Sequence, residues 1–249
     1  MSDEVEVPES HPRYESLLTR HRIEAGVDRG ITSRQGLIAQ GRGEAYDYLL
    51  GERTLESADR AERAAAAYLL SAEHAVISVN GNAAALVPGE LVELAEVTGA
   101  DLEVNLFNRT EERIEAIAEY LREHGATAVK GLTADGTIPG LDHERAKVDA
   151  DGIEVADVVL VPLEDGDRAE ALGAMGKTEL VVDLNPLSRS AQVATVPIID
   201  NIVRAIPGIT AHARALADDP EAQDAAIAAF DADEALADAE RAIRTGGDQ

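Results

Sequence analysis

The sequence predicts an α/β fold built on a doubly wound, mainly parallel sheet with an N-terminal helical extension. Short apolar runs rich in β-branched residues alternate with longer helix-forming stretches through the middle of the chain. The runs at 156–163 and 179–184 are almost continuously apolar, as expected for strands covered by helices on both faces. The first strand begins only near residue 75, so the preceding segment is expected to be the extension.

The elements before that strand are expected to be helical. Residues 12–26 predict an amphipathic helix, with Ser10 as a candidate cap and Pro12 in the first turn. Its apolar positions are Tyr14, Leu17, Leu18 and Ile23. Six glycines between 26 and 51 then predict a helical but heavily interrupted segment. Residues 54–71 are strong helix formers.

The remaining signals alternate. In order, we expect strand 75–80, helix 83–98 restarted at Pro88, strand 102–107, helix 110–124, a weaker strand 127–132, and strands 156–163 and 179–184. We expect one structural unit in three parts. These are a disordered acidic tail and helical segment at 1–73, a nucleotide-binding core at 74–216, and an acidic, alanine-rich extension at 217–249.

The composition excludes several classes of partner. The net charge is −26, with 48 acidic and 22 basic residues, which argues against binding to nucleic acid or to anionic membrane surfaces. The chain has no cysteine, so thiolate catalysis, disulfides and cysteine metal sites are excluded. The acidic N-terminus lacks the features of a signal peptide, and no apolar run approaches a membrane span of about 20 residues. We therefore expect a cytoplasmic protein.

The acidic residues also suggest an environment. Only three of the basic residues are lysines, and a carboxylate-dense, lysine-poor, alanine-rich composition resembles that of proteins from salt-loving microbes. Concentrated salt would screen the self-repulsion of such a chain.

The ends of the predicted strands are rich in polar and turn-forming residues. They read Asn80-Gly81-Asn82, then 105–109, 164–167 and 183–189. Each alone is ordinary turn chemistry. The carboxyl ends of parallel strands share one sheet edge, where such folds bind ligands, so the four together predict a binding site.

Five arginines are candidates for that site by their sequence context. They are Arg13, Arg20, Arg42, Arg109 and Arg189. Arg42 between glycines and Arg189 between serines favour a functional role, whereas the other three are equally well explained as surface ion-pair partners. Asp165 and Asp183 are candidates to bind ribose or Mg²⁺, and capping suits Asp167 better. The six histidines show no metal-ligand spacing, so no protein metal site is expected.

Two alternatives remain open from the residues alone. "NRTEER" at 108–113 resembles the adenosine-2′-phosphate pocket of shikimate-dehydrogenase-like enzymes, which favours an NADP-dependent oxidoreductase. Against it, Asn82 replaces the second glycine of the G-x-G-x-x-G turn and would crowd a pyrophosphate. The other alternative is a nucleotide-binding sensor without chemistry.

Long motifs carry a more specific resemblance. "SHPRY", "GLIAQGRGEAYDYLLGE", "AVISVNGNAAALVP", "LEVNLFNRT", "ADVVLVPLEDGDRAEAL", "VVDLNPLSRSAQ" and "IIDNIVRAIP" follow one another between residues 10 and 207. Together they resemble the archaeal phosphopantothenate synthetase (4-phosphopantoate–beta-alanine ligase) family. The acidic N-terminal tail and the C-terminal extension lie outside these motifs.

The resemblance implies a Rossmann-like, homodimeric ligase of coenzyme A biosynthesis. It implies that 4-phosphopantoate and beta-alanine are joined with ATP and Mg²⁺, through an acyl adenylate, with release of AMP and diphosphate. The ATP contacts that it implies are Arg20, Arg42, Asp183, Leu184, Asn185, Arg189, Ser190, Asn201 and Ile202. Arg42 and Arg189 would stabilise the charge that develops on phosphorus and on the leaving diphosphate. We expect the turn at 80–82 to face the bound substrates and to help hold the 4-phosphate.

Overall fold

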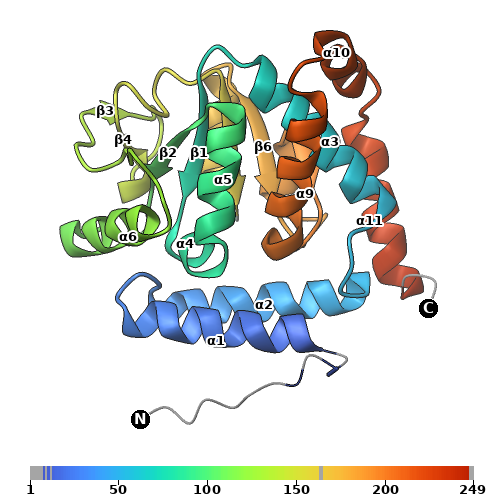
Figure 1. The fold of residues 1–249 in the computed structure, drawn as a ribbon, viewed down its shortest axis with the longest axis horizontal. Coiled ribbons are helices and arrows are strands. Elements are labelled where there is room, and N and C mark those ends of the chain that lie inside the picture. The colour runs from blue at the N-terminus through green and yellow to red at the C-terminus, as the bar shows by residue number, and fades with distance from the viewer. Residues whose placement is uncertain (1–7, 9, 12, 163–164, 247–249) are drawn as a thin grey trace.

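The predicted doubly wound sheet is present in the computed structural model, which describes residues 8, 10, 11, 13–162 and 165–246. Its main sheet has five parallel strands in the order β2-β1-β5-β6-β7 (Figure 1). The strands are β1 (Ala75–Val79), β2 (Asp101–Val104), β5 (Val158–Pro162), β6 (Thr178–Val182) and β7 (Val196–Ile198). The strand order reverses direction between β1 and β5, and ligands bind at such a switch point in open α/β sheets.

Helices cover both faces of the sheet. In β1, Ile77 joins the larger apolar core, whereas its neighbour Val76 packs on the opposite face. The larger core lies under α3 (Glu56–Ser71), α5 (Pro88–Thr98), α6 (Glu111–Glu123) and α9 (Ile202–Leu216). The opposite face is covered by α7 (Gly166–Ala174), which packs on α8 (Arg189–Val193), and by the segment containing the β3 (Gly136–Thr137) and β4 (Lys147–Val148) hairpin and a short 3-10 helix (Glu144–Ala146). Strands buried on both sides explain the continuous apolar runs.

The N-terminal extension is a helical hairpin. Helices α1 (Tyr14–Asp28) and α2 (Arg34–Leu50) run side by side across the end of the sheet where β1 leads into α4 (Gly81–Leu86) (Figure 1). The expected interruption at Gly30 is present, as the turn between the two helices, but those expected within 34–50 were wrong, because α2 is continuous through its three glycines. Ser33 accepts the amide of Gly36 at the start, and Gly51, with φ +90°, ends the helix.

The first helix differs from its prediction in the face that it buries. Ile23 is buried as expected, but Ser16, Thr19 and Gly26 bury the rest of that face, whereas Leu17 and Leu18 are half-buried. The residue before the helix is Arg13, not Ser10, and Pro12 lies outside the described residues. Small side chains on this face let α1 approach α4 closely, and a Cβ at Gly26 would collide with the side chain of Ala85.

Other predictions had mixed outcomes. Pro88 does restart the helix, since α4 ends at Leu86 and α5 begins at Pro88. The weak strand at 127–132 is reduced to one parallel bridge between Lys130 and Glu103 beside β2. Strand β7 and the β3–β4 hairpin were not predicted. The expected disorder of residues 1–10 and the end of the strand at Leu163 fall largely on residues outside the described ranges.

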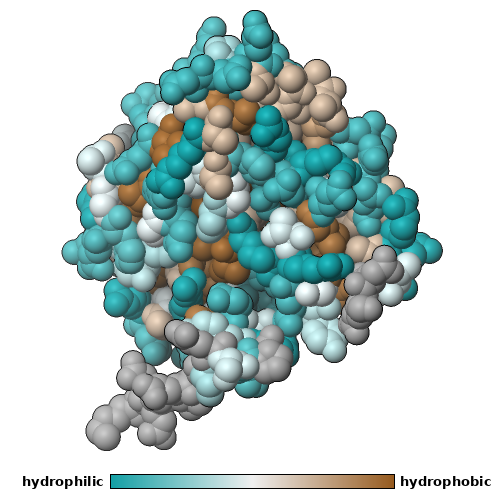
Figure 2. All heavy atoms as spheres, turned by 45° about the vertical axis from the view of Figure 1, so that its right-hand side comes forward, coloured by the Kyte–Doolittle hydropathy of each residue, from teal (hydrophilic) through white to brown (hydrophobic). Residues whose placement is uncertain are grey.

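The acidic C-terminal segment forms two helices, α10 (Pro220–Ala228) and α11 (Ala232–Thr245). Both pack on α3, and α11 also contacts α2 and β7. Figure 2 shows hydrophilic side chains over most of the visible face, with smaller apolar patches between them. Within the described ranges, no helix combines the length and apolar character needed to cross a membrane.

Candidate active site

Two adjacent cavities lie between α2 and the carboxyl ends of the strands. Their volumes are about 410 Å³ and about 280 Å³. Residues that line both cavities are Ala39, Arg42, Phe107, Asp165 and Asp183. The cavities therefore meet where α2 crosses the ends of β5 and β6, at the edge where the sequence predicted a site. Glu164, in one of the predicted strand-end turns, lies outside the described residues.

The larger cavity contains most of the predicted ATP-contacting residues. Those lining it are Arg42, Asp183, Leu184, Asn185, Arg189 and Ser190. The turn after β6 is fixed by Asp183, whose carboxylate accepts the amide of Asn185 at 3.0 Å and the hydroxyl of Ser188 at 2.6 Å. Ser190 donates to the same carboxylate at 3.3 Å. The turn is thus held rigid by its own side chains before any ligand is bound.

The two arginines that the sequence favoured for a functional role both line this cavity, but only one of them forms an ion pair among the described residues. The side chain of Arg42, exposed on α2, makes no hydrogen bond or ion pair within the part of the chain that the structure describes. Arg189 follows the Asp183 turn, with Nη2 2.9 Å from the Glu170 carboxylate, and its side chain is 65% exposed. That hydrogen bond raises the pKa of Arg189. Arg42 is therefore the cation more readily available to a phosphate.

Asn201 and Ile202 lie beside the larger cavity. They line a small cavity of about 20 Å³ together with Asp183 and Leu184. Asn201 caps α9 and also donates to Asp47 on α2 at 2.8 Å. Asp47 in turn accepts from Arg204 at 2.6 Å, which joins the amino end of α9 to the hairpin. Burial opposes the charge on Arg204, but its bonds to carboxylates raise its pKa.

Arg20 is the predicted ATP residue that the structure does not bring to the cavities. Its guanidinium makes two hydrogen bonds to Glu44, at 2.9 and 2.5 Å, and its side chain is 49% exposed. Glu44 also accepts from Arg13, so these three residues form a surface network between α1 and α2. The hydrogen bond to Glu44 raises the pKa of Arg20. Its contact with ATP stays a prediction.

The turn at 80–82 attaches the hairpin to the sheet. Asn80 caps α4 through the Ala83 amide and donates to the Pro162 carbonyl at 2.7 Å, which joins the ends of β1 and β5. Asn82 donates to the Gly36 carbonyl on α2 at 3.0 Å. A Cβ at Gly81 would collide with the Ile31 carbonyl. All three residues line the smaller cavity, but both asparagine side chains are already bonded to protein partners, and the contact of this turn with the substrates stays a prediction.

Two further arginines in the smaller cavity were not selected from the sequence. Arg113 on α6 and Arg145 both line it. Arg145 is buried and lies 3.1 Å from Asp165, where the cavities meet. Arg113 belongs to "NRTEER", whose other arginine, Arg109, donates to the Gly131 carbonyl at 2.7 Å and lines neither cavity. The motif signalled Arg113, but its resemblance to an NADP pocket assigned it to a different chemistry.

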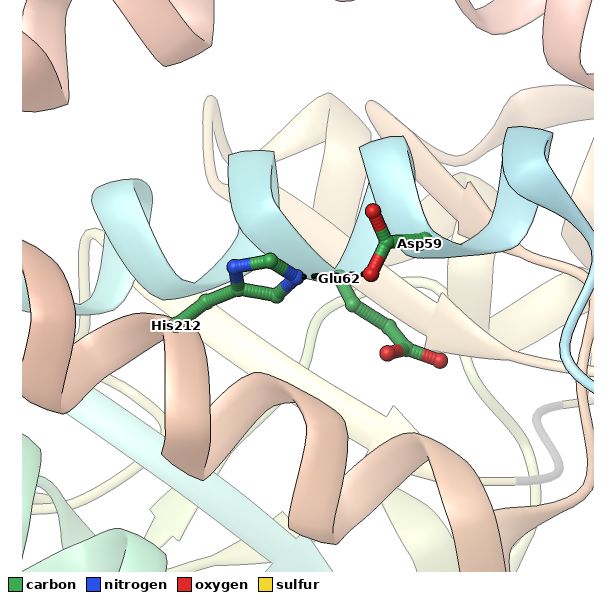
Figure 3. A group of neighbouring side chains, drawn as sticks. All are labelled: Asp59, Glu62 and His212. Atoms are coloured by element: carbon green, nitrogen blue, oxygen red, sulfur yellow. Dashed lines mark hydrogen bonds and ion pairs between the residues drawn. The ribbon is translucent and has the colours of Figure 1, made fainter.

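Outside these cavities, a cluster of titratable side chains lies between α3 and α9. Asp59, Glu62 and His212 offer donor atoms that lie within 4.8 Å of one another, and His212 Nε2 is 3.0 Å from Asp59 (Figure 3). None of the three lines the two large cavities. Glu62 is only 2% exposed. Burial and the nearby carboxylates of Asp200 and Asp59 raise the pKa of Glu62 from 4.5 to about 9.

This raised pKa predicts how stability changes with pH. Unfolding exposes Glu62, which then releases its proton near pH 4.5 rather than near 9. Its contribution to stability is therefore complete below pH 4.5 and is lost as pH rises towards 9, by up to about 1.4 kcal/mol per pH unit. Glu62→Gln, which keeps the neutral shape, should flatten this slope in melting curves recorded from pH 5 to 9. Glu56→Gln, on the exposed first turn of α3, is the matched control, and an unchanged slope in Glu62→Gln would contradict the assignment.

Comparison with known proteins relates the chain to one enzyme family. The family model described as phosphopantothenate/pantothenate synthetase matches residues 57–246. Similar proteins include a "4-phosphopantoate–beta-alanine ligase" of Thermococcus kodakarensis, 60% identical over 215 residues, which cover 86% of this chain and 82% of that protein. A protein of the same name from Methanosarcina mazei is 57% identical over 209 residues, covering 84% of this chain and 82% of its own.

These matches correct one expectation and bear on the alternatives. The C-terminal helices, which the motif resemblance left outside, fall within the matched residues up to 246. The similar proteins are named as ligases, which does not favour the oxidoreductase alternative. The family match covers more than half of the chain, and the relatives match it over most of their own length. The chain therefore belongs to the phosphopantothenate/pantothenate synthetase family.

Proposed function

We propose that this chain is an ATP-dependent ligase that joins 4-phosphopantoate to beta-alanine in coenzyme A biosynthesis. The product is 4′-phosphopantothenate, and AMP and diphosphate are released. The observation that carries the proposal is the pair of adjacent cavities, one lined by most of the residues expected to contact ATP and the other sharing five lining residues with it. The names of the similar proteins support the same substrates.

The chemistry that fits this arrangement is adenylation. A carboxylate oxygen of the acid attacks the α-phosphorus of ATP, and the bond to the β-phosphate breaks to release diphosphate. The neutral amine of beta-alanine then attacks the acyl carbon and loses a proton as the amide forms, and AMP leaves. Arg42, at the junction of the cavities, and Arg189, beside the Asp183 turn, stabilise the negative charge in both displacements without transferring protons.

A magnesium ion is expected to accompany ATP and to neutralise its phosphates. The oxygen ligands that Mg²⁺ prefers are present at the junction as Asp165 and Asp183. Asp183 already accepts hydrogen bonds from its own turn, and Asp165 lies beside Arg145. These carboxylates are therefore better suited to bind water molecules around the ion than to coordinate it directly as a full set of protein ligands. Most ligands to the ion would then come from ATP and water.

The proposal includes a homodimer that meets through the helical hairpin. Residues 13–53 hold seven arginines and six acidic residues, in a chain whose overall balance is −26. Self-repulsion therefore opposes association less on this segment than on a stretch with the average charge of the chain. Helix α2 also carries exposed apolar side chains, namely Leu37, Ile38, Tyr48 and Leu49. Such a combination favours burial against a second copy.

Isotope transfer tests the proposed reaction. With both carboxylate oxygens of 4-phosphopantoate labelled with ¹⁸O, adenylation should leave one labelled oxygen in AMP once the amide has formed. Mass spectrometry of the nucleotide products would detect it. The chain lacks a P-loop lysine to reach the β- and γ-phosphates, which favours this route over an acyl phosphate.

The same experiment separates the alternatives. Labelled inorganic phosphate with ADP as co-product would refute adenylation. Consumption of NADPH without AMP would instead support the oxidoreductase alternative.

A further inference from the structure

The smaller cavity contains a half-buried arginine that the proposed ATP chemistry does not use. Arg113 Nη1 donates to the Asn108 carbonyl, and its Nη2 donates to the Ile31 carbonyl at 3.1 Å. A guanidinium has five N–H donors, so three remain after these two bonds. Its Nε is buried and has no hydrogen-bond partner among the described residues. Arg113 is thus fixed in place with donor capacity to spare.

The charge of this arginine is also unbalanced. In the described part of the chain no carboxylate forms an ion pair with Arg113, although the sequence holds 48 acidic residues. Burial lowers the pKa of Arg113, which shows the cost of holding this charge partly out of water. A guanidinium always remains protonated, so a bound anion is what would relieve that cost.

The position of Arg113 indicates which part of a ligand it meets. Arg145 and its partner Asp165 lie at the junction with the larger cavity. Arg113 does not line the larger cavity, and it lies against Ile31 and Gly81, where the hairpin meets the end of β1. An acid substrate must place its carboxylate at the junction to reach ATP. Its opposite end then lies towards Arg113.

We propose that Arg113 binds the 4-phosphate of the acid substrate, and that it makes the enzyme prefer the phosphorylated acid over pantoate. The inference rests on the proposed function. Arginine forms strong, geometrically selective hydrogen bonds to phosphate. It also gives "NRTEER" a role: the phosphate at this motif belongs to the substrate and not to a dinucleotide.

The test compares the two acids in steady-state kinetics at saturating ATP and beta-alanine. Arg113→Gln should lower the ratio of kcat/KM for 4-phosphopantoate to that for pantoate by about 10- to 150-fold, the effect of losing a charge-assisted hydrogen bond. Arg109→Gln is the matched control, because Arg109 is also half-buried in "NRTEER" and bonds a carbonyl, yet lines neither cavity. It should leave the ratio unchanged. An equal loss for both acids in Arg113→Gln would show a merely structural role and overturn the proposal.

A second measurement needs no variant. Inorganic phosphate should compete with 4-phosphopantoate in the unaltered enzyme, but it should not compete with pantoate, which leaves the phosphate position vacant. Competition with both acids, or with neither, would overturn the assignment even if Arg113→Gln failed to fold. If the unaltered enzyme joined neither acid to beta-alanine, the proposed function itself would fail. Turnover with an unchanged acid ratio in Arg113→Gln would refute this inference alone.

Discussion

Arg42→Ala should reduce kcat/KM for ATP by about 10- to 150-fold, which corresponds to about 1.5–3 kcal/mol. Arg42 lines both cavities, and within the described residues no carboxylate competes for it. Its charge is therefore available to the phosphates in the ground state and in the transition state. Removing it should affect ATP affinity or turnover, since no described intramolecular bond is lost. Initial-rate assays of AMP release over a range of ATP concentrations would measure the effect.

Two further variants serve as the control and as a second test of the role of Arg42. Arg34→Ala removes another exposed arginine from the same helix, one that lines neither cavity, and should retain unaltered kinetics. Arg189→Ala should show a loss of the same kind, because Arg189 lines the larger cavity. Unaltered kinetics in both Arg42→Ala and Arg189→Ala would show that these are solvated surface charges. A loss of melting temperature without a kinetic effect would make them structural.

The melting temperature should rise steeply with potassium chloride. With 48 acidic against 22 basic residues, like charges repel across the surface, and the range of that repulsion grows to about 30 Å at 0.01 M salt. Screening it should raise the melting temperature by roughly 10 °C between dilute buffer and molar salt. For a chain of this length, that shift corresponds to about 3–5 kcal/mol.

A comparison of salts shows whether screening is the cause. Potassium chloride and potassium sulfate at equal, low ionic strength should give the same melting temperature if screening dominates. Sulfate also stabilises proteins by its exclusion from their surface, so a higher value in sulfate would reveal that contribution. Equal melting temperatures in dilute buffer and in molar potassium chloride would contradict the prediction.

The features predicted correctly from the sequence depend on local signals. Strands buried on both faces read as apolar runs wherever they occur, and Pro88 restarts a helix through its own fixed geometry. Breaks in α2 were predicted wrongly because glycine weakens an isolated helix. In the fold, the missing side chain of Gly36 leaves room for Asn82 of α4, which donates to the Gly36 carbonyl. Strand β7 is short and contains Pro197, which is tolerated at this sheet edge but obscures the pattern.

The candidate site was predictable in part for the same reason. The residues of the Asp183 turn are consecutive in sequence, so one motif located them together. Arg145 was missed because no predicted element or motif contained it, and its place in the cavity depends on where the segment after α6 crosses the sheet. Arg113 was quoted within a motif, yet its neighbours Ile31 and Gly81 are distant in sequence. Contacts of this kind are set by topology and not by local pattern.

The attachment of the α1–α2 hairpin has a consequence for alignment. Directional bonds join it to the amino ends of α4 and α9, from Thr32 to the Gly81 carbonyl, from Asn82 to the Gly36 carbonyl, and from Asn201 to Asp47. An apolar interface tolerates sliding by a fraction of an ångström, whereas hydrogen bonds weaken steeply when their angles change. The position of the hairpin relative to the rest of the fold is therefore fixed by hydrogen bonds at three separate points along its length. These bonds fix the distance between α2 and the Asp183 turn, which both line the larger cavity. They therefore also fix the length that a bound nucleotide must match.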